Sequence, residues 1–222
     1  MKLLIENVEK IDYVTESFND KKSLYITGPF LVGEQVNKNG RYYPIGLLER
    51  EVSRYTKERI NEKCAAGELN HPSTPNLNLD RISHVITELR RDGNNYIGKA
   101  KIAESQPMGQ IVKGLILDEG MKLGVSSRGV GSLKQHEKGY NIVQEDFRLC
   151  VAADIVSDPS GPGAFVKGIM EGAEWIYDSV SGTWMEERID NTQKELHKLN
   201  KRQLEERTVA IFESLMRDIA KL

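Results

Sequence analysis

The last 38 residues of the chain differ so strongly from the rest that they divide it into two parts. Residues 185–222 contain no glycine or proline and are rich in charged residues. Apolar residues recur among them at helical spacing, at Ile189, Leu196, Leu199, Leu204, Ile211, Leu215, Ile219 and Leu222. This pattern predicts a long amphipathic helix within a C-terminal segment, residues 179–222. Because such a helix alone is marginal in water, we expect its apolar stripe to dock on another protein or on a second copy in a homo-oligomer.

The remaining residues have the composition of one ordinary globular domain, residues 21–178, preceded by a weakly patterned polar arm, residues 1–20. The whole chain of 222 residues is 39% hydrophobic and 29% charged, and its net charge of −2 gives no support to nucleic-acid binding. Its two cysteines indicate no disulfide framework, and no apolar run is long enough to span a membrane. The N-terminus lacks a signal-peptide core, so we expect a protein of a reducing cytoplasm without membrane or nucleic-acid partners.

Turn signals divide the domain into short elements. Segments 81–91 and 96–103 read as strands on either side of an Asp-Gly-Asn-Asn turn, which predicts a β-hairpin. The pattern further predicts a bent strand over 23–33, helices over 46–66 and 107–120, and one or two strands over 140–159. Gly67 is expected to end the first helix as its C-terminal cap.

The stretch LGVSSRGVGSL, residues 123–133, begins like a buried strand but contains adjacent serines. If Leu123 and Val125 point into the core, strand alternation directs Ser126 to the opposite, open face. The glycines that follow permit unusual backbone angles, so the N–H groups of Ser127, Arg128 and Gly129 are expected to form an anion-binding loop suited to an oxyanion.

A nucleophilic serine requires a base, and the chain has four histidines. His71, in a Gly/Pro-bounded loop, is the candidate base, whereas His84 reads as a packed or rim residue, and His136 and His197 as surface residues. Asp154, a carboxylate in an apolar strand, is the candidate that orients His71, with Glu68 as a competitor.

Two other kinds of site are disfavoured by the sequence. GVSSRGVG lacks the Gly-Lys-Ser/Thr ending of a phosphate loop and is not a dinucleotide fingerprint. Glu68 and His71 have metal-ligand spacing, but Gly67 and Pro72 disrupt the helix that such spacing requires, and no further ligand cluster follows. We therefore expect neither a metal nor a cofactor.

Several blocks, in order from about residue 20 to 165, resemble the prohead core proteases of T-even-type tailed phages. The blocks are NKNGRYYP (37–44), GELNHP (67–72), GVSSRGVGSL (124–133), GYNIVQEDFRL (139–149) and ADIVSDPSGPGAF (153–165). The resemblance implies an α+β fold, a small and mostly antiparallel β-barrel surrounded by helices, as in the herpesvirus assembly proteases. It also implies a serine endopeptidase with Ser126 as nucleophile and His71 as base. Herpesvirus enzymes use a second histidine as the third member, whereas the corresponding strand here has Asp154.

The resemblance further implies cleavage after glutamate in Leu/Ile-x-Glu sequences, including sites in the protease itself. The chain contains nine such triplets, against about four expected by chance from its composition. The triplets ending at Glu6, Glu206 and Glu213 are the candidate self-cleavage sites. A pocket for glutamate needs a cation, and Lys38, Arg41 and Arg81 are the candidates.

The resemblance thus implies a protease that cuts phage scaffold proteins and the major capsid protein inside the prohead, in the host cytoplasm. The alternative is a non-catalytic capsid or scaffold protein that retains the fold. A hydrolase of small esters is a third reading, which the long charged helix and the self-matching triplets disfavour.

Overall fold

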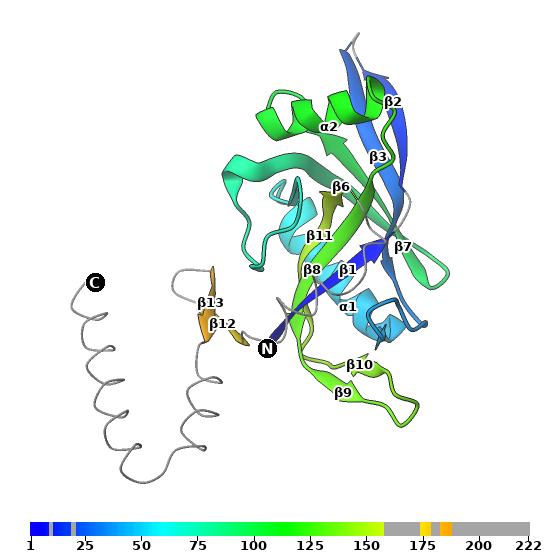
Figure 1. Ribbon diagram of the computed structural model, residues 1–222, viewed down its shortest axis with the longest axis vertical. Helices are drawn as coiled ribbons and strands as arrows, with labels where there is room; N and C mark the ends of the chain where they lie inside the picture. Colours follow the sequence, from blue (N-terminus) through cyan, green and yellow to red (C-terminus); the bar gives the residue numbers. More distant parts are fainter. Residues whose placement is uncertain (9–10, 19–20, 158–173, 179–182, 188–222) are drawn as a thin grey trace, which may run out of the picture.

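The computed structural model describes residues 1–8, 11–18, 21–157, 174–178 and 183–187. Within these ranges the protein is a mixed α/β structure, made mostly of strands with two α-helices (Figure 1). The described strands form one five-stranded, two three-stranded and one two-stranded sheet, and these do not join into a closed barrel. The antiparallel, strand-rich architecture matches the prediction, whereas a closed barrel is not what the described strands form.

The five-stranded sheet has the order β2-β3-β7-β6-β5 and is antiparallel throughout. Its strands are β2 (Asp12–Phe18), β3 (Lys21–Val32), β5 (Ala66–Glu68), β6 (Ile82–Asp92) and β7 (Asn95–Ile102). The predicted hairpin of β6 and β7 is confirmed, with Gly93 at a φ of 59° in its turn. The predicted bend of β3 is also confirmed, because its register with β7 shifts between Pro29 and Leu31.

A three-stranded sheet of order β1-β8-β11 lies at the centre of the molecule (Figure 1). It contains β1 (Lys2–Val8), β8 (Gly124–Gly131) and β11 (Arg148–Val156), with β8 antiparallel to both neighbours. A parallel bridge between Leu69 and Ile155 connects the outer edge of β11 to the chain that leaves β5. This connection brings the GELNHP and GVSSRG blocks to the same part of the fold.

The smaller elements lie around these two sheets. A second three-stranded sheet contains β4 (Arg41–Tyr42), β9 (Leu133–Gln135) and β10 (Asn141–Val143), and the two-stranded sheet contains β12 (Glu174–Asp178) and β13 (Thr183–Glu187). A 3-10 turn at Leu79–Arg81 precedes β6. No helix within the described ranges is long and apolar enough to cross a membrane.

Both predicted helices of the domain are present. Helix α1 (Ile45–Tyr55) continues into a π-helical turn (Thr56–Ile60) and buries Leu47, Leu48, Glu51, Val52 and Tyr55. Helix α2 (Pro107–Leu117) begins with proline, as expected, and packs against β6 and β7.

The predicted role of Gly67 as a helix cap is wrong. The helical region ends before Lys63, which has a φ of 56°, and Gly67 lies in β5. A Cβ at this position would lie 2.1 Å from Ala153 O and 2.3 Å from His84 Nε2. Glycine is therefore required because β5, β6 and β11 approach one another closely here.

The two ends of the chain also differ from their predicted conformations. Residues 2–8 and 12–18, expected to be a weakly patterned arm, are strands that pair with β8 and β3. Residues 183–187 form β13, so the predicted helix does not start at residue 185. Trp184 of β13 is buried and belongs to the hydrophobic core. The rest of the predicted C-terminal helix, residues 188–222, lies outside the described residues.

Candidate active site

Ser126 lies on the central strand β8, directly opposite Asp154 on β11. Side chains paired in this way stand on the same face of a sheet, so the hydroxyl and the carboxyl share one face. The prediction that this face is open is wrong, because Ser126 and Asp154 both have no exposed surface. Ser126 Oγ is buried and has no hydrogen-bond partner among the described residues. A buried hydroxyl without a partner costs about 1–3 kcal/mol and is unusual in a structural serine.

A buried cluster of three charged side chains covers this face of β8. Arg128 Nη2 donates to Glu68 Oε1 at 2.9 Å and to Asp154 Oδ1 at 3.1 Å, and Arg128 Nε lies 2.6 Å from Asp154 Oδ2. All three side chains have no exposed surface. Glu68 N also donates to Asp154 Oδ1 at 2.9 Å. Burial raises the pKa of Asp154 to about 6, although Arg128 opposes this shift.

Arg128 also holds the loop that follows His71. Its Nη1 donates to Thr74 O at 2.7 Å and to Asn76 O at 2.9 Å. The start of the loop is attached to β11, where Asn70 N donates to Ile155 O at 2.8 Å. Arg128 therefore links the nucleophile strand to the segment that carries the candidate base.

His71 is half-buried in this loop. Burial lowers its pKa, and the positive charge of Arg128 lowers it further. A histidine that is neutral near pH 7 is suited to accept a proton from a serine. No hydrogen bond joins the His71 ring to Asp154 or to another residue in the described part of the chain. The Asp154 carboxylate accepts hydrogen bonds from Arg128 and from Glu68 N instead.

His84 is a packed histidine, one of the two roles that the sequence allowed. It is fully buried on β6, where Nε2 lies 3.0 Å from Ala153 O and Nδ1 lies 2.9 Å from Ser83 Oγ. Burial lowers its pKa to about 4. It is therefore neutral at pH 7 and connects β6 with β11.

The predicted oxyanion loop is part of strand β8. Ser127, Arg128 and Gly129 all pair with β1, whereas only Arg128 and Gly129 pair with β11, whose register shifts on both sides of Val151. Gly129 is needed for packing rather than for a special backbone angle, because a Cβ there would lie 2.4 Å from Phe147 Cε2. Backbone N–H groups along a central strand point alternately to its two neighbours, so those on one side line up along an edge instead of converging in a loop.

Ser127 lies on the opposite face of β8 and lines a cavity of about 560 Å³. Glu6, Lys38 and Tyr43 line the same cavity. Of the three predicted cations, Arg41 contacts Glu6, with Nη1 2.7 Å from Glu6 Oε1, and Lys38 is nearby. The third cation is on the other face, because Arg81 Nη2 donates to Leu69 O and its Nε lies 3.4 Å from Glu68 Oε2. The other two self-cleavage candidates, Glu206 and Glu213, lie outside the described residues.

Comparisons with known proteins identify the family of the chain. The family model described as prohead core protein serine protease matches residues 4–174. The chain belongs to this family. A protein of Enterobacteria phage T4 named prohead core protein protease is 40% identical over 146 residues, which cover 66% of this chain and 69% of that protein.

The fold of the family is shared as well. The solved structure of the bacteriophage T4 capsid assembly protease is 36% identical, with a TM-score of 0.65, and the match covers 70% of this chain and 96% of that one. As a member of the prohead core protease family the chain is a protease. The family match begins at residue 4, within β1, so the N-terminal strand is part of the family's common region.

Two features of the prohead protease site were missed by sequence reasoning. Arg128 was expected to contribute to an anion-binding loop, but its side chain is the buried centre of the charge cluster. In the segment 37–43 only Lys38 and Arg41 were candidates for a glutamate pocket, whereas four of its members, Asn37, Asn39, Arg41 and Tyr43, contact Glu6. The only available signal was the density of polar and aromatic residues in NKNGRYYP.

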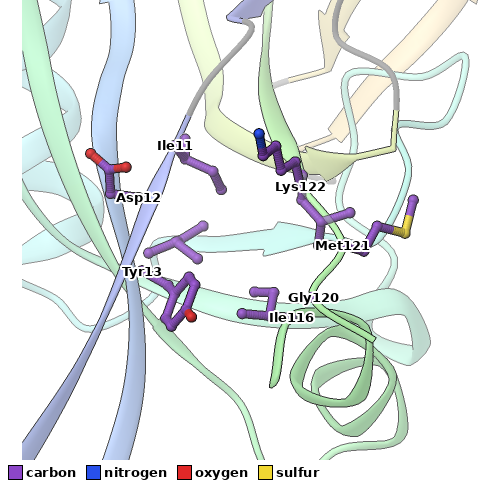
Figure 2. A pocket seen from close by; sticks show the side chains of 9 residues that line it. Ile11, Asp12, Tyr13, Ile116, Gly120, Met121 and Lys122 are labelled. Carbon is purple, nitrogen blue, oxygen red and sulfur yellow. The ribbon is translucent and has the colours of Figure 1, made fainter. Parts of the chain in front are cut away.

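A second cavity, of about 480 Å³, is lined by none of the predicted catalytic residues. Figure 2 shows Tyr13 of β2 on one side of it, and Gly120, Met121 and Lys122 of the segment between α2 and β8. Its lining is mainly apolar and it has no pair of nucleophile and base. This cavity gives no alternative to the region around Ser126 as the candidate active site of this prohead protease.

Proposed function

We propose that this protease is a serine endopeptidase that cleaves phage scaffold proteins and the major capsid protein during prohead maturation. It acts after glutamate in Leu/Ile-x-Glu sequences, cleaves itself, and works inside the prohead in the host cytoplasm. The observation that carries the mechanism is the unpartnered Ser126 hydroxyl, placed opposite Asp154 on the face that Arg128 links to the His71 loop.

In the proposed reaction His71 accepts the Ser126 hydroxyl proton as Oγ attacks the scissile carbonyl carbon. The tetrahedral intermediate collapses when the peptide C–N bond breaks and His71 gives the proton to the leaving amine. Water then attacks the acyl-enzyme ester with His71 again as base, which releases the new carboxyl end and restores Ser126. The pKa of His71, lowered by burial, keeps its ring neutral for the first step.

Asp154 is proposed as the third member of the site, where it positions the loop of His71 through Arg128. Its carboxylate holds Arg128, and Arg128 holds Thr74 O and Asn76 O in the loop of His71. Glu68 contributes to the same arrangement through Arg128 Nη2. Asp154 therefore fixes the base by fixing the arginine that anchors its loop.

The N–H groups of Ser127, Arg128 and Gly129 that point toward the β1 edge are the proposed oxyanion and main-chain donors. They are occupied by β1 in this structure, because β1 pairs with β8 over Lys2–Val8. A substrate carbonyl next to Ser126 would meet donors of this strand. The C-terminal segment, residues 179–222, is proposed to dock on scaffold, shell or a second copy.

A peptide assay tests this function. The substrate contains Leu-Ala-Glu-Ala, and the control peptide has glutamine in place of glutamate. We expect the parent and Ser127→Ala proteins to cleave the first peptide after glutamate, and Ser126→Ala to be slower by at least about 10³-fold. Loss of cleavage in Ser127→Ala alone would place the nucleophile at Ser127. Absence of cleavage by every protein would favour the non-catalytic capsid-protein alternative.

A further inference from the structure

The carboxylate of Glu6 is held by four hydrogen-bond donors from one segment of the chain. Asn37 Nδ2 and Asn39 Nδ2 donate to Glu6 Oε2 at 2.6 and 2.8 Å, and Arg41 Nη1 and the Tyr43 hydroxyl donate to Oε1 at 2.7 and 2.8 Å. Each oxygen has two donors, one of the four is a guanidinium, and the Glu6 side chain is 15% exposed. A site made of donors alone selects a carboxylate over a neutral amide, which has only one oxygen to accept them.

The donor segment is shaped before it meets Glu6. Asn37 Oδ1 accepts hydrogen bonds from Asn39 N and Arg41 N, both at 3.0 Å, and Gly40 has a φ of 68°. This turn fixes the backbone of Asn39 and Arg41, whose side chains both donate to Glu6. Asn39 Nδ2 and Arg41 Nη1 also donate to Ile5 O, at 3.0 and 3.3 Å. The segment therefore recognises a glutamate side chain together with the carbonyl of the residue before it, as in an extended chain.

The register of β1 places this glutamate next to the adjacent serines. Glu6 pairs with Ser127 and Asn7 with Ser126, so the Glu6–Asn7 peptide bond lies across from the Ser126–Ser127 bond. Leu4-Ile5-Glu6 is one of the Leu/Ile-x-Glu triplets of the chain. Main-chain pairing of this kind depends little on sequence, so another extended peptide can add to β8 in the same way.

Strand β1 is deeply buried and occupies the edge of β8 beside the candidate nucleophile. Leu3, Leu4 and Ile5 are each 1% exposed, and β1 covers one complete edge of β8. Ser126 has no exposed surface in this arrangement. A substrate strand can pair with β8 only when β1 has left that edge.

We propose that Asn37, Asn39, Arg41 and Tyr43 form the pocket that selects the glutamate side chain of substrates, and that Glu6 of the N-terminal strand occupies this pocket in the structure. The inference rests on the proposed cleavage after glutamate and adds the residues that determine it. β1 is then an internal competitor that lies in the place of the substrate. The pocket is available to a capsid or scaffold peptide after β1 is displaced.

A binding measurement separates this pocket from catalysis. The protein carries Ser126→Ala and Ser127→Ala, so that no peptide is cut, and the probe is a fluorescein-labelled peptide with the sequence of residues 2–8, KLLIENV. The second probe has glutamine in place of its glutamate. Fluorescence anisotropy gives the affinity of each probe for the full-length chain, with and without Glu6→Gln.

We expect Glu6→Gln to tighten binding of the glutamate peptide at least tenfold, because the internal competitor loses its charge. The glutamine peptide should bind at least tenfold more weakly to the same protein. Adding Arg41→Gln should remove most of this discrimination. The matched control is Arg90→Gln, since Arg90 pairs only with the exposed Glu88 among the described residues and should leave the discrimination unchanged. If Arg41→Gln fails to fold, Tyr43→Phe removes one donor and should reduce the discrimination several-fold.

Undetectable binding of both peptides to the Glu6→Gln protein, or equal binding of both, would overturn the proposal. Retained discrimination in folded Arg41→Gln and Tyr43→Phe proteins would overturn it as well. Failure of the proposed function has a different signature: glutamate-selective binding that depends on Arg41, without hydrolysis by the protein that keeps both serines. Conversely, hydrolysis after glutamate that is unaffected by Arg41→Gln would retain the protease function and reject this pocket.

Discussion

Arg128 Nε lies 2.6 Å from Asp154 Oδ2, and neither side chain has any exposed surface. The same arginine contacts Glu68 and two backbone carbonyls of the His71 loop. One buried cation thus serves two carboxylates and an active-site segment. Removal of Arg128 would leave the buried carboxylates unpaired and would release the His71 loop. A loss of stability and a loss of activity should therefore appear together.

Replacing Arg128 with methionine should lower the free energy of unfolding by about 3–5 kcal/mol, because Glu68 and Asp154 lose their buried partner. Urea unfolding followed by circular dichroism measures the change. The matched control is Arg90→Met, whose ion pair with Glu88 is exposed and should contribute less than about 1 kcal/mol. Equal effects of the two substitutions would contradict the structural role of the cluster.

Gly67→Ala should destabilise the protein by about 1–3 kcal/mol, because the added Cβ would lie 2.1 Å from the backbone oxygen of Ala153. Gly46→Ala is the control, since a Cβ there meets nothing within 4 Å and the residue lies in α1. Alanine at position 46 should raise the stability by up to about 1 kcal/mol. Thermal unfolding of both variants tests the comparison, and an unaffected Gly67→Ala protein would show that β5 and β11 can separate without cost.

The stability of the protein should depend on pH through two buried groups with opposite signs. The pKa of His84 is lowered to about 4, so its contribution is present above pH 6.5 and is lost as the pH falls toward 4. The pKa of Asp154 is raised to about 6, so its contribution is present below pH 3.8 and is lost as the pH rises toward 6.

Between pH 4 and 6 these two contributions oppose each other. Asp154→Asn removes one of them, so the free energy of unfolding of this variant should fall more steeply on acidification, by up to about 1.4 kcal/mol per pH unit. Urea titrations of parent and variant at several pH values in this range give the two slopes. Parallel curves would show that Asp154 does not bind its proton more tightly in the folded protein.

The activity should persist to lower pH than an ordinary histidine would allow. His71 must be neutral to accept the Ser126 proton, and burial together with Arg128 lowers its pKa. The acidic limb of kcat/KM for a Leu-x-Glu peptide should therefore have its midpoint below 6.5. A midpoint at or above that value would indicate that the titrating base is not in the environment described for His71.

Local sequence patterns correctly predicted the elements that are determined by residues close together in the sequence. The hairpin of β6 and β7 follows from its turn, and α1 from its apolar stripe. The roles of Gly67 and Gly129 could not be predicted, because each is decided by a segment far along the chain, at Ala153 and Phe147. Gly67 was predicted to cap a helix and Gly129 to allow an unusual backbone angle, whereas both provide room for close packing.

The same limit applies to the site. The sequence identified Ser126, Asp154 and His71 as candidates, and the fold brings the first two opposite each other and ties the loop of the third to β8. The sequence did not indicate that residues 2–8 form a strand beside the adjacent serines. Local residues do not specify which strand such a segment will pair with. The carboxylate site around Glu6 follows only from that pairing.

Labelling with a fluorophosphonate tests most directly whether Ser126 is the nucleophile. The reagent forms a covalent bond with an activated serine, and trypsin then releases residues 123–128, which contain both serines, for fragmentation in a mass spectrometer. The parent, Glu6→Gln and Ser127→Ala proteins should be labelled on Ser126, and His71→Ala should react much more slowly. An adduct on Ser127, or labelling of Ser126 at the same rate in His71→Ala, would contradict the proposed mechanism.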